Sequence, residues 1–182
     1  MRKITAGYAG TVVALLLGAA ILPAQAAVAE PTAAELGHCA VEIFELGENT
    51  EPPASAVCFA TEDEVAAYLA AMDGSATDDS SRATATSIAV GTVYKDAAGA
   101  GGSLTFWGSN GCAGATFGFA TLASDWENSI SSVRATNGCW GTVYAATNYG
   151  GTRLNCTPFC SALGALNDSV KSVVFRPSGT LG

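Results

Sequence analysis

The sequence predicts an all-β domain in the C-terminal half of the chain, preceded by a shorter acidic segment. The tetrapeptide Gly91-Thr92-Val93-Tyr94 recurs as Gly141-Thr142-Val143-Tyr144, and each copy is followed by glycines, a polar loop and a strand that carries serines. Matching ends in the same order indicate one supersecondary unit that is used twice. From Ser87 onward, short strands alternate with turn residues and no helical periodicity exceeds one turn. This pattern favours a sandwich of two sheets.

Residues 1–26 are typical of a secretory signal peptide. Arg2 and Lys3 precede an apolar run over about residues 11–22, and small residues follow it. The run is shorter than the roughly 18 to 20 apolar residues that span a membrane. We therefore expect cleavage after Ala26, or after Ala29 in an alternative frame. We also expect a secreted (extracellular) mature chain with no membrane attachment.

Charge separates the remaining chain into two regions. The sequence has 8 Lys and Arg against 16 Asp and Glu, a formal net charge of -8. Most of the acids lie between Glu30 and Asp79, a stretch without Lys or Arg, whereas the chain after Arg82 is nearly neutral. We expect no nucleic-acid partner, because no basic stripe is available to bind phosphates.

Residues 27–74 form the acidic N-terminal flank, which is predicted to be a hairpin plus a short helix. After a short tail, apolar and acidic residues alternate over residues 38–46, which predicts a half-exposed strand. Pro52-Pro53 requires a turn, and residues 56–59 can return beside the first strand.

A capping box begins the predicted helix of the flank, with Thr61 at its start and Glu64 three residues later. Its apolar residues share one face, and Gly74 ends it. The helix face is formed by Val65, Tyr68, Leu69 and Met72. Two interpretations of the flank remain open. It is either a propiece or partner-docking arm, or a solvated segment that packs loosely on the main domain.

The main domain is predicted over residues 87–178, after a linker at residues 75–86 and before a tail at residues 179–182. Its predicted strands fall into two sets, one in each unit. These are residues 87–95, 103–107, 115–120 and 131–135, then 140–145, 152–156 and 171–176. About 90 residues suffice for one such domain, although a core of that size benefits from disulfides.

Six cysteines in an exported chain indicate disulfides, and the even number leaves none necessarily free. Sequence alone allows about 15 pairings. Locality favours Cys39 with Cys58, Cys112 with Cys139, and Cys156 with Cys160. Zinc is disfavoured, because His38 is the only histidine and the paired Cys-x-x-Cys spacing is missing.

The second unit carries Tyr144, then Tyr149 after four residues and Gly151 after one more. With this pattern it resembles the βγ-crystallin family of double Greek-key domains. Tyr144, Tyr149 and Gly151 match the aromatic and glycine signature of that family's folded first hairpin, where the glycine takes a positive φ. In the first unit Gly99 stands where the second aromatic residue should be, so that hairpin is expected to fold differently. The resemblance covers residues 87–178 and implies two Greek-key motifs that form a βγ-crystallin-like sandwich.

Each unit also carries the family's later motif, which has six positions. The first two are Asn or Asp, the next two are variable, the fifth is Ser or Thr and the sixth is Ser. The copies are Glu127-Asn128-Ser129-Ile130-Ser131-Ser132 and Asn167-Asp168-Ser169-Val170-Lys171-Ser172. In the family this motif is a calcium loop, and the two loops share their ions across a pseudo-twofold axis. Calcium takes six to eight oxygen ligands, which these residue types supply.

The fifth motif position distinguishes the two loops. The first loop has Ser131, whereas the second has Lys171, an ammonium group without an acceptor lone pair. The resemblance therefore implies at most one strong calcium site, drawn from the residues of both loops. The candidate ligands are Glu127, Asn128, Ser129, Ser131, Asn167, Asp168 and Ser169. An alternative is that Ser132 and Ser172 hold the loops by backbone hydrogen bonds without a metal.

No catalytic set is predicted. Asp125 and Glu127 flank Trp126 in one loop, where calcium or turn roles are favoured over glycoside hydrolysis. A Ser-His-acid triad would have to use His38, and no other histidine exists to serve as the base. The three tryptophans could form a carbohydrate platform, but core packing is favoured.

The sequence thus predicts a non-enzymatic binding module that is stabilised by disulfides and one calcium ion. The alternative is a protein inhibitor of an extracellular protease, because the chain is similar to secreted crystallin-fold metalloprotease inhibitors. Its contact would be the Cys156–Cys160 loop with Pro158 and Phe159, or the inserted loop at residues 108–114.

Overall fold

The computed structural model describes residues 37–47, 55–74 and 86–181. Contacts divide the chain into Met1–Glu30 and Pro31–Gly182, and every described residue belongs to the second unit. The predicted signal peptide, the Pro52-Pro53 turn and nearly all of the predicted linker lie outside the described residues. Within the described ranges, no helix is long and apolar enough to cross a membrane.

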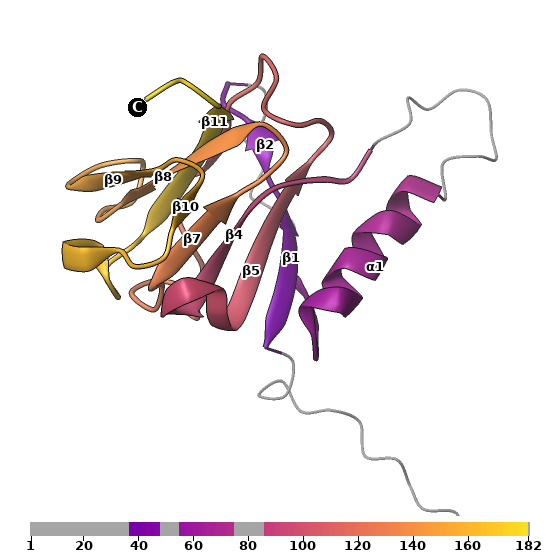
Figure 1. Cartoon of the computed structure of the whole chain (residues 1–182), viewed down its shortest axis with the longest axis horizontal. Coiled ribbons are helices and arrows are strands. Elements are labelled where there is room, and N and C mark those ends of the chain that lie inside the picture. The colour runs from indigo at the N-terminus through magenta and orange to yellow at the C-terminus, as the bar shows by residue number, and fades with distance from the viewer. Residues whose placement is uncertain (1–36, 48–54, 75–85, 182) are drawn as a thin grey trace, which may run out of the picture. The chain divides into compact units, whose positions relative to one another are not determined.

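Two sheets build the domain (Figure 1). One has six strands in the order β10-β7-β4-β5-β1-β3, and the other has five in the order β2-β6-β11-β8-β9. The first unit supplies β4 Ile88–Asp96, β5 Ala100–Gly108, β6 Phe117–Phe119 and β7 Ser132–Ala135. The second supplies β8 Cys139–Tyr144, β9 Arg153–Cys156, β10 Phe159–Cys160 and β11 Ser172–Pro177.

The two units exchange their third strands. β6 of the first unit pairs with β11 of the second, and β10 of the second pairs with β7 of the first. Each sheet therefore combines three strands of one unit with one strand of the other, which is the arrangement of two interlocked Greek keys. The predicted all-β fold with two βγ-crystallin-like Greek-key motifs is confirmed by this topology.

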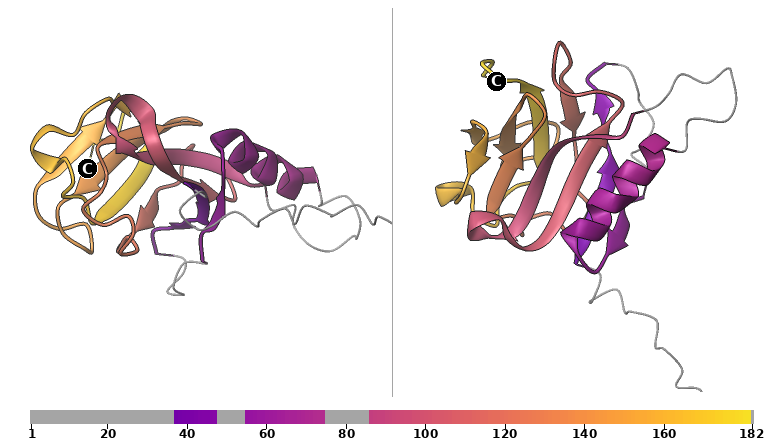
Figure 2. Two further views of the ribbon diagram at one scale, coloured as in Figure 1. Left: turned by 90° about the horizontal axis from the view of Figure 1, so that it is seen from below. Right: turned by 45° about the vertical axis from the view of Figure 1, so that its right-hand side comes forward.

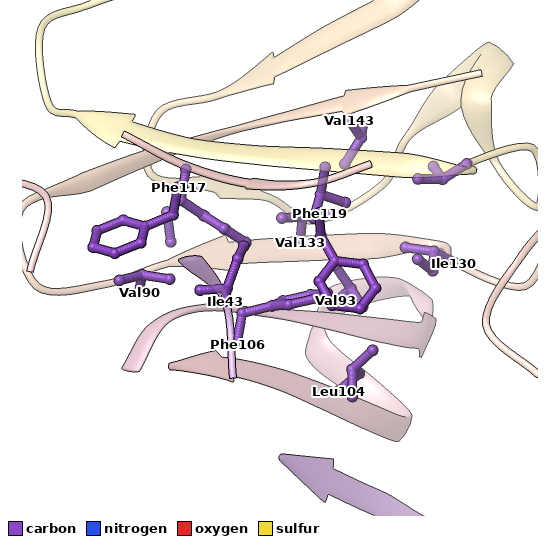
Figure 3. Close-up of a cluster of buried hydrophobic side chains, with 14 of the residues drawn as sticks. Ile43, Val90, Val93, Leu104, Phe106, Phe117, Phe119, Ile130, Val133 and Val143 are labelled. Carbon is purple, nitrogen blue, oxygen red and sulfur yellow. The ribbon is translucent and has the colours of Figure 1, made fainter. Parts of the chain in front are cut away.

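The main core lies between the two sheets, and Figure 3 shows its central side chains. Phe106 of β5 is fully buried, with its ring centroid 5.3 Å from that of Phe119 and 5.5 Å from that of Phe175. Phe119 and Phe175 belong to the opposite sheet. Tilted and edge-on aromatic contacts of this kind add to the burial of apolar area. They tie the two sheets together at the centre of the sandwich.

The acidic flank adds strands to both sheets. It comprises β1 His38–Glu42, β2 Phe44–Glu45, β3 Val57–Phe59 and α1 Glu62–Gly74. β1 runs parallel to β5 and antiparallel to β3, so the predicted hairpin is present. β2 pairs with β6 in the other sheet. Both views in Figure 2 show α1 beside the β1 end of the six-stranded sheet.

The described part of the flank is not a loosely packed segment, and that interpretation is wrong. Cys39, Ala40 and Val41 are all buried, whereas a half-exposed strand was expected. Cys39 and Val41 join the main core, and Ala40 packs with the helix residues Val65 and Leu69. The alternation of apolar and acidic residues does not reveal that α1 covers the outer face of β1.

The capping box of α1 is confirmed. The Glu64 amide donates to the Thr61 hydroxyl over 3.2 Å, and the Glu64 carboxylate accepts from the Thr61 amide over 3.1 Å. These reciprocal bonds satisfy amides that the first helical turn leaves unpaired. The predicted apolar face meets Phe59 of β3 and Trp107 of β5. The helix is thereby fixed on the six-stranded sheet.

Candidate metal centre

The two serine motifs lie side by side and bond each other reciprocally. The Asn128 amide donates to the Val170 carbonyl, and the Asp168 amide donates to the Ile130 carbonyl, each over 3.0 Å. Asn128 and Asp168 also share a left-handed backbone, with φ of 56° and 51°. Asn and Asp tolerate this conformation better than most residues. The two second positions of the motif are therefore equivalent across a pseudo-twofold axis.

One side of this pair brings oxygen atoms together. The Ser131 hydroxyl, which is almost fully buried, donates to Oδ1 of the exposed Asp168 over 3.4 Å. Asn167 donates from its side-chain amide to Oδ2 of the same carboxylate over 2.6 Å. The site therefore offers a hydroxyl from one loop and a carboxylate from the other, and the Asn167 amide nitrogen holds that carboxylate in place. This donor set fits a hard cation such as Ca²⁺.

The opposite side has the same backbone but a different side chain. The Ser131 amide donates to the Tyr94 carbonyl, and the Lys171 amide donates to the Tyr144 carbonyl, each over 2.8 Å. Lys171 thus occupies the position of Ser131 in the other loop. Its ammonium group has no lone pair and repels a cation, so this donor set does not fit Ca²⁺.

The final serine of each motif serves the fold. The Ser132 hydroxyl donates to the Asp96 carbonyl over 2.6 Å and accepts from the Gly99 amide over 2.9 Å. The Ser172 hydroxyl likewise donates to the Ala146 carbonyl over 2.7 Å and accepts from the Tyr149 backbone amide over 3.1 Å. Both serines are fully buried. They tie the motif to the first hairpin of the same unit without a metal, as the alternative interpretation proposed.

Other predicted ligands have local partners. The Ser129 hydroxyl donates to the Trp126 carbonyl over 3.0 Å, and the Ser169 hydroxyl donates to the Asn167 carbonyl over 3.2 Å. Glu127 is half-buried, and its amide donates to the Ala123 carbonyl. In the described part of the chain, no group of three or more His, Cys, Asp and Glu side chains could hold a metal. Any ion here therefore depends on the Asp168 carboxylate together with hydroxyl and carbonyl oxygens.

A serine, a histidine and an acid meet where the flank packs against β5, which the sequence did not indicate. Nδ1 of His38 lies 2.8 Å from the Ser103 hydroxyl and 3.9 Å from Oε1 of Glu62. In a catalytic triad the hydroxyl and the acid bind opposite ring nitrogens, whereas here both approach Nδ1. Ser103 is also fully buried. The geometry fits a contact that fixes β1 to β5 and α1, and not an active site.

The structure contains the three disulfides that locality favoured. They are Cys39–Cys58, Cys112–Cys139 and Cys156–Cys160. The last of these closes the loop that is the candidate inhibitory contact. Thr157 and Pro158 are exposed there, whereas Phe159 is half-buried in β10 with its ring centroid 4.1 Å from the Arg134 guanidinium carbon. Phe159 is thus less available to a partner than its place in a short loop implied.

Solved βγ-crystallin domains are similar to this chain over about half of its length. The N-terminal domain of protein S is 20% identical with a TM-score of 0.40, and the match covers 49% of this chain and 97% of that domain. A βγ-crystallin domain from Flavobacterium johnsoniae is 27% identical with a TM-score of 0.36, covering 50% and 99%. One from Clostridium beijerinckii is 20% identical with a TM-score of 0.39, covering 48% and 97%. Comparisons with protein-family models and with curated proteins gave no match. The exchanged third strands, and not these scores, define the βγ-crystallin-like class.

Proposed function

We propose that this chain is a secreted, non-enzymatic binding module whose βγ-crystallin-like fold holds one calcium ion between its two serine motifs. The observation that carries the proposal is the approach of the Ser131 hydroxyl to the Asp168 carboxylate, 3.4 Å apart. The two residues belong to different loops, so an ion bound by both would join them. The calcium would act as a structural clamp.

The charges favour calcium over a weakly charged ligand. Asp168 is exposed and supplies a full negative charge, and Ser131 supplies a neutral oxygen from a buried position. Because calcium would bind the folded loops and not the unfolded chain, it should stabilise the fold by mass action. At a concentration about 100 times the Kd this amounts to about 2.7 kcal/mol.

Thermal unfolding with and without calcium tests the proposal. We expect the melting temperature of the mature protein to rise at millimolar calcium, and to rise much less with magnesium, which requires a stricter geometry. The variant Asp168→Ala should lose the rise, whereas Asp125→Ala, a matched acid outside the motif, should keep it. An unchanged melting temperature of the wild-type protein would show that calcium does not bind and stabilise the fold.

A second candidate is inhibition of an extracellular metalloprotease. It is favoured by the loop that the Cys156–Cys160 disulfide closes, in which Thr157 and Pro158 are exposed while β10 pairs with β7. A constrained loop loses little entropy when it binds. An inhibitor should slow a secreted metalloprotease stoichiometrically and remain intact. Pro158→Ala should weaken the inhibition, and full activity of a panel of such proteases would exclude this function.

A further inference from the structure

A cavity of about 380 Å³ opens beside the main core, and its lining includes none of the candidate calcium ligands. Its walls are apolar side chains from three strands and from the segment that follows β6. Val41 comes from β1, Leu104 from β5 and Phe119 from β6, while Leu122 and Trp126 come from the segment after β6. Figure 3 shows Leu104 and Phe119 on opposite sheets at this part of the core.

The flank and the main domain build the cavity together. Val41, Ser55 and Ala56 of the flank line it with residues of the Greek-key domain. A Greek-key pair alone would lack that wall. The cavity is therefore a feature of this chain's added strands, and its use would explain why the flank is built into the sandwich.

The chemistry of the lining defines the class of occupant. No charged side chain is among the lining residues. The aliphatic hydroxyls are those of Ser55 and Thr121, and both residues are exposed, which places them at the mouth. Burying a charge without a partner is strongly unfavourable, so the interior excludes ions. An uncharged apolar molecule with at most one polar end fits this distribution.

The size also favours a ligand over a packing defect. The cavity is open to solvent on one side, where exposed residues line it, so its volume compares with ligand clefts and not with sealed voids. Small-molecule pockets typically measure about 300 to 1,000 Å³. An apolar cavity of about 150 Å³ already binds benzene. A volume of about 380 Å³ therefore accommodates a two-ring compound or a medium alkyl chain.

We propose that this cavity binds a small uncharged apolar molecule, such as a fatty alcohol or an aromatic compound. The inference goes beyond the proposed function and does not depend on calcium. No lining residue carries a cation that could pair with a carboxylate, so an uncharged ligand is favoured. An alternative occupant is the chain's own segment at residues 48–54, which contains two glutamates. The experiment distinguishes these occupants.

The probe is N-phenyl-1-naphthylamine, an uncharged fluorophore, titrated into the intact mature protein. We expect saturable binding at one site and quenching of Trp126 emission. Decanol should displace the probe at least about tenfold better than decanoate, because the carboxylate of decanoate would be buried without a partner. A tenfold difference corresponds to about 1.4 kcal/mol. The Trp126→Phe variant should retain probe binding and lose most of the quenching.

Rim substitutions make the test specific. Ala56 and Ala123 are exposed residues of the lining, so Ala56→Phe and Ala123→Phe add bulk at the mouth without altering the buried walls. Each should weaken probe binding at least tenfold. Ala113→Phe is the matched control, because Ala113 is exposed and lies outside the lining. Melting curves establish that each variant is folded.

Three results would overturn the proposal. The first is no saturable binding up to the solubility of the probe. The second is equal affinity in the rim variants and the Ala113→Phe control. The third is binding that appears only when residues 48–54 are replaced by glycine and serine, which would identify the chain's own segment as the occupant. Weakening in both rim variants, with an unchanged control, supports the site.

Discussion

The two serine loops have the same backbone and different side-chain chemistry. The backbone amides of Ser131 and Lys171 donate equivalent hydrogen bonds to a carbonyl at the end of the first strand of their unit. The hydroxyls of Ser132 and Ser172 likewise donate to equivalent backbone carbonyls. Only the first loop places a hydroxyl beside the carboxylate of the other. The comparison teaches that the residues that hold the fold are separate from those that would bind an ion. One side chain can remove a site without disturbing its loop.

The first hairpins of the two units also share a backbone conformation and differ in their side chains. Gly99 stands in the place of Tyr149, and the first hairpin was therefore expected to fold differently. The structure contradicts that expectation, because Ala98, Gly99 and Gly101 have positive φ values, as do Asn148, Tyr149 and Gly151. Glycine adopts this region without cost. The aromatic residue is therefore dispensable for the backbone of the corner, and its ring contributes packing with Tyr144, 6.0 Å away.

The largest expected difference between the units concerns their matched glycines. A Cβ at Gly91 would overlap the ring of the fully buried Phe175, whereas a Cβ at Gly141 would lie 3.4 Å from that ring. Overpacking of a core costs about 1 to 3 kcal/mol. Gly91→Ala should therefore lower the free energy of unfolding by about 3 kcal/mol, and Gly141→Ala by less than about 1 kcal/mol. Urea unfolding measures both, and equal losses would contradict the asymmetry.

The buried serines should behave alike, in contrast to the glycines. Removal of either hydroxyl leaves a carbonyl and an amide without this partner, in residues that are half-buried or exposed, which costs about 1 kcal/mol. We expect Ser132→Ala and Ser172→Ala to destabilise the protein by similar amounts, with or without calcium. Chemical unfolding of the two variants tests this. A large effect in only one variant would show that the loops are not structurally equivalent.

Exchange of one side chain should create a second ion site. Lys171→Ser restores a hydroxyl at the position that matches Ser131, opposite Asn128, and removes a repelling charge. We expect calcium binding to rise from one ion to two, the new site being at least about tenfold weaker because Asn128 carries no charge. Lys171→Met removes the charge without adding an oxygen and serves as the control. Two ions in that control would show that repulsion alone closes the second site.

The smallest effect concerns Tyr149, which has no counterpart in the first unit. Partial burial, and to a lesser degree the neighbouring Tyr144, raises the pKa of the Tyr149 phenol. Its contribution to stability is fully present below the unfolded pKa of about 10 and is lost as the pH rises through the higher folded pKa. Tyr149→Phe should therefore lose less stability than the wild type between about pH 9 and pH 11. Unfolding measured across that range provides the test, and identical losses would contradict it.

The sequence predicted the repeated part of the fold because its signals are local. The Gly-Thr-Val-Tyr doublet and the serine motifs each lie within one hairpin or loop, so they identify the strands without knowledge of tertiary contacts. β10 was missed, since it has only two residues and lies inside a loop closed by a disulfide. Its pairing with β7 depends on the other unit.

The flank was harder to predict because its partners are distant in the sequence. The alternation around Glu42 correctly indicated strands, but the parallel pairing of β1 with β5 and the cover provided by α1 are tertiary features. The meeting of His38, Ser103 and Glu62 has the same origin. The candidate calcium site could be predicted from the sequence only in part. Its residue types are evident from each motif, while the pairing of Ser131 with Asp168 requires the pseudo-twofold arrangement of the loops.

Calorimetric titration of the mature protein with calcium tests the central claim most directly. The account predicts one ion per chain in the wild type, and no measurable binding in Asp168→Ala at the same concentrations. Asn128→Ala, the equivalent position on the other side, should still bind one ion. No heat in the wild type, two equal sites, or unchanged binding in Asp168→Ala would contradict a single site formed by Ser131 and Asp168.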